Sequence, residues 1–247
     1  MGSSAPRLFA EPRSGPSLGR LVAVAALAAA AATAGSGEAH DPDVRPPIAR
    51  MDFVPPAPGS YPLHAIMRAP DGPVLDLEGR RRPLSRFTAG KITLLGFIYT
   101  SCADPQGCPL MLQVFHAVRH RVSEDPALRE HVRLVSLSFD PARDTPAVMR
   151  HYAAAAPPNG VQWAFLTTDL PRTLLPILDG FGQDVRVELD ARGRATGPLA
   201  HVLKVFLLDE RAIVREIYTT SYLFTDVIVN DIKTLRLVSQ PSRRILP

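Results

Sequence analysis

The two cysteines of this 247-residue chain lie close together in a single loop. Cys102 and Cys108 are separated by five residues, and the loop that holds them follows an apolar run ending at Tyr99. Pro109 comes directly after the second thiol and suits the first turn of a helix. Thiolates are nucleophiles, redox groups and soft metal ligands, and the positive end of a helix lowers a thiol pKa. The pattern predicts redox or soft-metal chemistry, with a structural disulfide that staples the loop as the simpler alternative.

A metal site here would need further donors. Two thiolates and one imidazole form a soft trigonal set that suits copper, especially Cu(I). His116 and His120 stand four residues apart on one predicted helix face, but Arg119 and Arg121 are interleaved with them. That arrangement indicates a solvated helix face rather than a metal site. The imidazole is therefore expected from elsewhere in the chain.

Strand and helix signals alternate around the cysteine loop. Apolar runs typical of buried strands occupy 91–99, 132–139 and 161–166. Helical spacing or an opening proline indicates helices over 109–122, 146–155, 171–180 and 227–238. The runs 202–208 and 213–218 suggest a hairpin. This order predicts an α/β sandwich around a mixed sheet. Ligands gather beyond the carboxyl ends of strands in such sheets. Asp140 follows one of those ends, so it is expected near the thiols, either orienting a ligand or capping its own strand.

The N-terminal region has the pattern of an export signal. Three arginines within residues 1–20 precede an unbroken run of small and apolar residues, and a small-residue cleavage zone follows. We predict a signal peptide over 1–34, with an uncleaved membrane anchor as the alternative. Proline-rich residues 35–60 are expected to form a flexible linker, 61–240 the globular domain and 241–247 a tail.

Composition restricts the partners. Residues 1–34 contain three Arg and one Glu, so the remainder has a net charge of +2 rather than the +4 of the whole chain. Clusters of Lys and Arg with interleaved aromatic residues are absent from the sequence, so a nucleic-acid partner is not expected. Export indicates an oxidising compartment, here a bacterial periplasm, where a close cysteine pair persists as a disulfide. Membrane contact is expected only through an uncleaved anchor.

Three segments, in the same order, resemble the Sco/SenC family. They are Gly90 through the cysteine loop to Pro109, the loop 138–146, and the stretch 199–209 that contains His201. The resemblance covers about residues 61–238 and implies a thioredoxin-like three-layer sandwich with a central mixed β-sheet. It also implies that Cys102, Cys108 and His201 ligate copper, as Cu(I) or Cu(II). The family's usual pair has three residues between the cysteines, so this chain is a variant with a wider loop.

The same resemblance implies a function. It suggests a periplasmic copper chaperone that delivers copper to, or reduces the copper-site thiols of, a cuproenzyme such as cytochrome c oxidase. Its partners would be that client and a thioredoxin-like protein that reduces its own thiols. The residues alone also allow a thiol–disulfide oxidoreductase that uses Cys102 and Cys108, with a disulfide between them when oxidised. His201 is needed for the first function and dispensable for the second.

Overall fold

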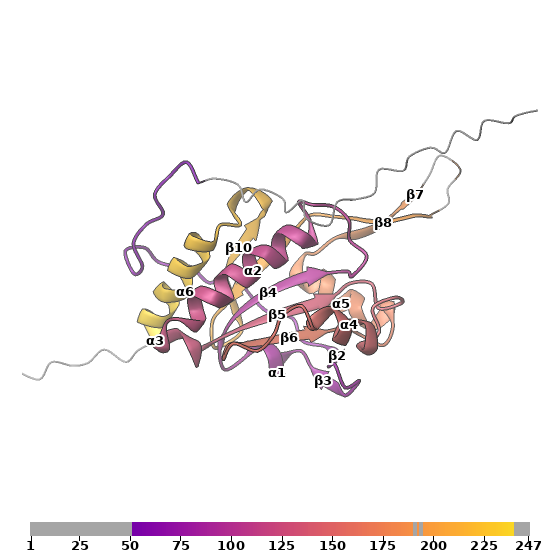
Figure 1. Ribbon diagram of the computed structural model, residues 1–247, viewed down its shortest axis with the longest axis horizontal. Helices are drawn as coiled ribbons and strands as arrows, with labels where there is room; N and C mark the ends of the chain where they lie inside the picture. Colours follow the sequence, from indigo (N-terminus) through magenta and orange to yellow (C-terminus); the bar gives the residue numbers. More distant parts are fainter. Residues whose placement is uncertain (1–50, 190–191, 193–194, 240–247) are drawn as a thin grey trace, which may run out of the picture. The chain divides into compact units, whose positions relative to one another are not determined.

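The computed structural model describes residues 51–189, 192 and 195–239. The predicted signal peptide, the linker before residue 51 and the tail 241–247 lie outside this part of the chain. Six strands form the central sheet in the order β1-β10-β9-β4-β5-β6 (Figure 1). Their bounds are β1 Met67–Arg68, β10 Ile213–Thr219, β9 Lys204–Leu208, β4 Ile92–Ile98, β5 Val132–Ser138 and β6 Gln162–Leu166. β4, β5 and β6 run parallel, whereas β9 is antiparallel to β4 and β10. The predicted mixed sheet is thereby confirmed.

Helices cover both faces of this sheet. The face covered by α2 (Cys108–Ser123) and α6 (Thr225–Ser239) also receives α4 (Pro146–Ala153), whose Tyr152 ring contacts Phe165 of β6. The other face is covered by α1 (Ser85–Thr88) and α5 (Pro171–Phe181), while the single turn α3 (Pro126–Arg129) follows α2. Every residue of β4 and β5 is buried, as expected for parallel strands covered on both sides.

The close approach of α2 to the sheet depends on a glycine. A Cβ atom at Gly96 would stand only 2.3 Å from the sulfur of Met111 in α2. On the opposite face Phe97 packs edge-on against Phe181 of α5, with ring centroids 5.5 Å apart. Gly96 thus lets the start of α2 lie close to the end of β4.

Two short ribbons accompany the central sheet, and one of them corrects the sequence interpretation of His201. β2 (Pro73–Leu75) pairs with β3 (Arg81–Pro83), and β7 (Val185–Leu189) pairs with β8 (Ala195–His201). The predicted hairpin is present as β9 and β10, connected through the 3-10 turn η1 (Thr220–Tyr222) to α6. His201, however, does not begin the β9 strand, because it is the last residue of β8 and pairs with Val185. The histidine therefore belongs to a separate ribbon.

Part of the predicted linker 35–60 makes hydrogen bonds to the C-terminal helix. The carbonyl of Pro56 accepts a hydrogen bond from the Asn230 side chain at 2.9 Å, and the Gly59 N–H donates to the Thr234 hydroxyl at 2.9 Å. Both partners lie on α6. This stretch is therefore docked along the C-terminal helix, a non-local contact that proline content alone does not reveal. Within the described ranges no helix is long and apolar enough to cross a membrane.

Candidate metal and redox centre

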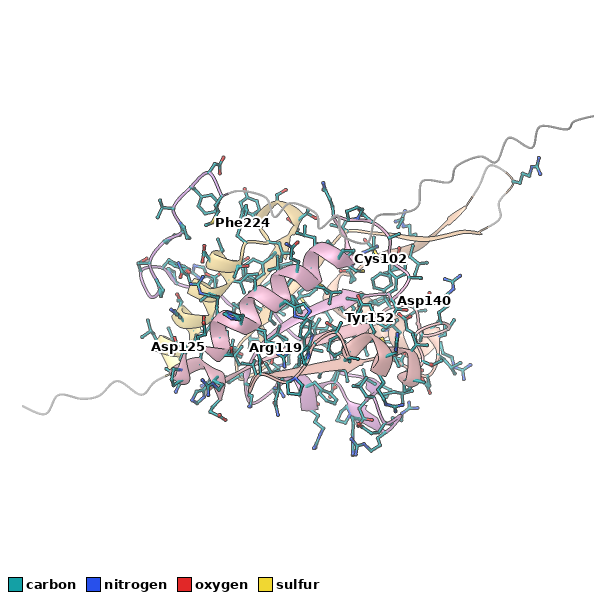
Figure 2. All side chains as sticks on the ribbon, in the orientation of Figure 1. Cys102, Arg119, Asp125, Asp140, Tyr152 and Phe224 are labelled. Carbon is teal, nitrogen blue, oxygen red and sulfur yellow. The ribbon has the colours of Figure 1, made fainter. Side chains whose placement is uncertain are left out.

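The five-residue spacer folds back on itself and brings the two sulfurs together. The N–H of Cys102 donates to the Tyr99 carbonyl at 3.2 Å, and the N–H of Gly107 closes a turn on the Asp104 carbonyl at 3.0 Å. Cys108 is the first residue of α2, and Figure 2 shows Cys102 beside that end of the helix. Both cysteines are free thiols, and the Cys108 side chain hydrogen-bonds the Cys102 sulfur.

The two thiols have opposite acidities. The pKa of Cys102 falls to about 5, first because the Cys108 thiol donates to its sulfur, and further because the N–H groups of Cys108 and Asp104 and the Tyr99 hydroxyl stabilise the thiolate against the cost of burial. The pKa of Cys108 is raised by its hydrogen bond to Cys102 and by burial, since its side chain is 1% exposed. At neutral pH the pair therefore holds one thiolate and one proton between two sulfurs.

Tyr99 connects this pair to the histidine ribbon. Its hydroxyl donates to Cys102 and accepts from the backbone N–H of Leu199 in β8, and its pKa is raised to about 12, mainly by burial. Its ring lies edge-on to the His201 ring at 5.9 Å. In the sequence, Tyr99 marks only the end of a predicted strand. Its position directly before the loop is the one signal that would have indicated a role at the site.

His201 presents one free nitrogen. Nδ1 lies 2.9 Å from the Leu199 carbonyl, and because a carbonyl only accepts, Nδ1 carries the proton in this arrangement. Nε2 is then a bare nitrogen, and it is buried without a hydrogen-bond partner. The ring packs against Phe139 at 4.8 Å as well as against Tyr99. A buried lone pair without a partner is unusual and suits a ligand position.

The three predicted ligands are not assembled as a trio. Within the described part of the chain, no three His, Cys, Asp or Glu side chains are arranged to hold one metal ion. The sulfurs are paired, and Tyr99 contacts both groups, because its hydroxyl bonds Cys102 and its ring lies edge-on to the His201 ring. Two soft sulfurs and a bare imidazole nitrogen fit copper in kind. A three-donor site nevertheless requires the imidazole to move toward the thiols.

Asp144, rather than Asp140, is the acid tied to the cysteine loop. Its side chain is 1% exposed and accepts from the Thr100 N–H at 3.1 Å, the Thr100 hydroxyl at 2.5 Å and the Ser138 hydroxyl at 2.6 Å. The Asp140 carboxylate instead pairs with Arg143 at 3.0 Å. Asp144 thus links Thr100, at the start of the cysteine loop, to Ser138 at the end of β5. The proposed role of Asp140 beside the thiols stays a prediction.

His116 and His120 do not share a site, and their helix face is only partly solvated. The His116 ring packs edge-on against Trp163 at 4.9 Å, and burial lowers its pKa. His120 approaches Glu124 at 3.4 Å. Arg119 lies between them but is 5% exposed, so the predicted solvated face is wrong at this residue.

The fold and the paired thiols define a thioredoxin-like α/β protein with a dithiol at the start of its first long helix. The family model described as SCO1/SenC matches residues 75–236. The chain therefore belongs to the SCO1/SenC family, as its sequence resemblance indicated. A comparison with curated protein sequences found no match.

Solved structures share the fold. Apo Sco1 from Thermus thermophilus is 26% identical with a TM-score of 0.57, and the match covers 72% of this chain and 95% of that one. Copper-bound ScoI from Arabidopsis thaliana is 19% identical with a TM-score of 0.57, covering 68% and 96%. BsSco, a member of the Sco family of cytochrome c oxidase assembly proteins in which a disulfide switch was identified, is 21% identical with a TM-score of 0.53, covering 70% and 95%. At these identities the last two establish the fold alone.

Proposed function

We propose that this protein is an exported copper-binding chaperone that serves the assembly of a cuproprotein such as cytochrome c oxidase. Cys102, Cys108 and His201 would hold the copper, which is cargo rather than a resident cofactor. The observation that carries the proposal is the hydrogen-bonded dithiol near a buried, unpartnered imidazole nitrogen. Family membership, the copper bound by the Arabidopsis relative and the N-terminal export pattern support it.

The acid–base state of the site prepares it for a soft cation. Cys102 is already a thiolate, so Cys108 is the thiol that must lose a proton when copper arrives. Binding therefore releases about one proton at neutral pH. Thiols of the client would then replace these donors one at a time. Ligand exchange between thiolates requires no change in the oxidation state of sulfur.

The unequal acidity of the two thiols favours a second candidate, a thiol–disulfide oxidoreductase. The Cys102 thiolate would attack a partner disulfide, forming a mixed disulfide and releasing one partner thiolate. Cys108 would then lose its proton and attack the Cys102 sulfur. The partner leaves as a dithiol with two electrons gained, and a Cys102–Cys108 disulfide remains. A thioredoxin-like reductant would restore the pair, so this chemistry also fits the reduction of a client's copper-site thiols.

Copper binding by the reduced protein separates the two candidates. We would measure copper stoichiometry and thiolate-to-copper absorption for the wild type, His201→Ala and the control His120→Ala. The chaperone proposal expects about one copper per chain, with the absorption changed in His201→Ala and unchanged in the control. Loss of all copper from the wild type, together with a reversible Cys102–Cys108 disulfide, would overturn it and leave the oxidoreductase.

A further inference from the structure

A cleft of about 930 Å³ runs along the β6 edge of the central sheet. Its walls are β6, the turn between β2 and β3, the short helix α1 and the loop before β6. None of Cys102, Cys108 and His201 lines it, and Figure 2 shows Arg119 well along α2 from Cys102. The cleft is thus separate from the thiol centre.

The backbone of β6 is open along this cleft. Thr167, just beyond β6, exchanges both N–H···O=C bonds with Leu75 of β2, so its polar groups point away from β5. Because strand residues alternate, the N–H and C=O groups of Phe165 and Trp163 point the same way. Among the described strands β6 ends the central sheet and pairs with β5, so these groups are not used in that ladder. Gln162 is exposed and Trp163 is half-buried, whereas Phe165 is 4% exposed, so the edge is most accessible at the start of β6. An unpaired edge is a template for another strand.

The cleft also carries positive charge that the protein itself does not neutralise. Five arginines and two acids line it, and the acids Asp76 and Glu78 are already paired with Arg80 at 2.8 and 2.6 Å. Arg133 is 8% exposed, and its guanidinium donates to the carbonyls of Arg86 and Ala89 and to the Thr93 hydroxyl. These neutral acceptors satisfy some N–H groups but leave the charge uncompensated.

Arg119 repeats this arrangement at the start of β6, the same end at which Arg133 pairs with Gln162. It is 5% exposed and donates to the carbonyls of Val161 and Pro157. Burial lowers the pKa of both buried arginines, that of Arg133 to about 10. Within the described residues neither Arg119 nor Arg133 pairs with a carboxylate, and the exposed Arg86, whose carbonyl accepts from Arg133, has no acidic partner either. An incoming carboxylate would meet buried charge in a low dielectric.

We propose that the β6 edge binds an extended acidic segment of a partner protein. The segment lies as an added strand against Trp163 and Phe165, and its carboxylates face Arg86 and Arg133. Arg133 pairs with Gln162 across the β5–β6 ladder, so both lie on the α1 face of the sheet. Alternate side chains of the bound segment would therefore be acidic. This surface would add a docking contact beyond the proposed copper function and independent of it.

The test uses the full chain and a short synthetic peptide of alternating Val and Glu, with a matched peptide in which Gln replaces Glu. Binding is followed by fluorescence anisotropy, and amide exchange of Trp163 and Phe165 is followed by NMR. We expect the Glu peptide to bind, to weaken with salt and to slow exchange at both amides. Arg86→Glu should weaken binding by roughly tenfold or more. The control Arg68→Glu makes the same charge change on β1, the opposite edge strand, and should leave binding unchanged.

Several results would overturn the proposal. Equal binding of the Glu and Gln peptides would show that charge does not drive binding. Equal weakening by Arg86→Glu and Arg68→Glu would show that only the net charge of the protein matters. Amide protection away from β6 would place the peptide elsewhere. Inorganic phosphate that reproduced the same amide shifts at equal affinity would make the cleft a site for free anions. If Arg86→Glu fails to fold, Arg82→Glu on the same cleft replaces it.

Discussion

The candidate centre has two parts. Its sulfur half, Cys102 and Cys108, is packed against the core, whereas its imidazole half, His201, lies on a ribbon outside the central sheet. Cys108 begins α2 and is 1% exposed, and the loop before it is fastened by Asp144 through Thr100. His201 ends β8, whose partner is β7 alone. The thiols are therefore held in place by packing, while the histidine has support that allows it to move. The comparison suggests that changes to the sulfur half affect both fold and chemistry, and changes to the imidazole half affect chemistry alone.

The largest effect is expected from removing a thiol. Cys108→Ala deletes a proposed ligand and the donor that stabilises the Cys102 thiolate. Copper affinity is measured by competition with a Cu(I) chelator. Loss of a residue that only supports a metal ligand can lower affinity by roughly a hundredfold, and loss of this ligand should lower it further. His120→Ala serves as the control. Retention of affinity within a few-fold would mean that the sulfur half is not the main support of the metal.

The next prediction concerns the different pKa values of the two thiols and their effect on stability. Alkylation of the reduced protein should proceed at Cys102 with an apparent pKa of about 5 and be slow at Cys108. Because the Cys102 pKa is lowered on folding, its thiolate favours the folded state increasingly as pH rises from about 5 towards the ordinary thiol value near 8.5, and this stability is lost as pH falls through about 5.

Cys108 has the opposite sign and acts only at higher pH. Its pKa is raised on folding, so its contribution is complete below the ordinary thiol value and declines above it. Between about pH 5 and 8.5 the Cys102 contribution to the slope of unfolding free energy should therefore be lost in Cys102→Ser, while the contribution of His116, whose pKa is lowered by burial, remains. Mass spectrometry of the labelled cysteines and urea unfolding at several pH values measure both effects. Equal alkylation of the two thiols would contradict the asymmetry.

A smaller effect is expected at the carboxylate that fastens the loop. Asp144→Asn replaces a buried acceptor of three hydrogen bonds by an amide that cannot accept all three. It should lower the free energy of unfolding by about 2–3 kcal/mol and weaken copper binding by about tenfold. The matched variant Asp140→Asn breaks a pair with the exposed Arg143 and should cost less than about 1 kcal/mol. Equal costs would show that Asp144 does not support the sulfur half.

The smallest change in stability is expected at the histidine. His201→Ala should weaken copper binding by about tenfold but alter the free energy of unfolding by less than about 1 kcal/mol, because the ribbon lies outside the central sheet. Chelator competition and urea unfolding on the same samples measure the two quantities. A stability loss as large as that of Asp144→Asn would remove the contrast between the two halves.

Much of the fold followed from local pattern. The apolar runs predicted β4 and β5, and the cysteine before Pro109 was correctly expected at a helix start. The site followed less well. His201 was expected at the head of the strand 202–208 and Arg119 on a solvated face, and the contacts of residues 56 and 59 with α6 were not predicted. These depend on pairing and docking between distant segments, for which single-sequence periodicity carries no signal.

The sequence by itself determined the dithiol, the strand and helix that present it and the family to which the chain belongs, because these depend on residue type and local periodicity. Only the tertiary structure decided how the five-residue spacer closes, which acid reaches the loop and where the imidazole lies. The Tyr99 hydroxyl accepts a hydrogen bond from the Leu199 N–H, and Asp144 accepts one from the N–H of Thr100, which lies 44 residues away in the chain. Such contacts form when the sheet brings strand ends together, so their partners emerge from packing rather than from the order of residues along the chain.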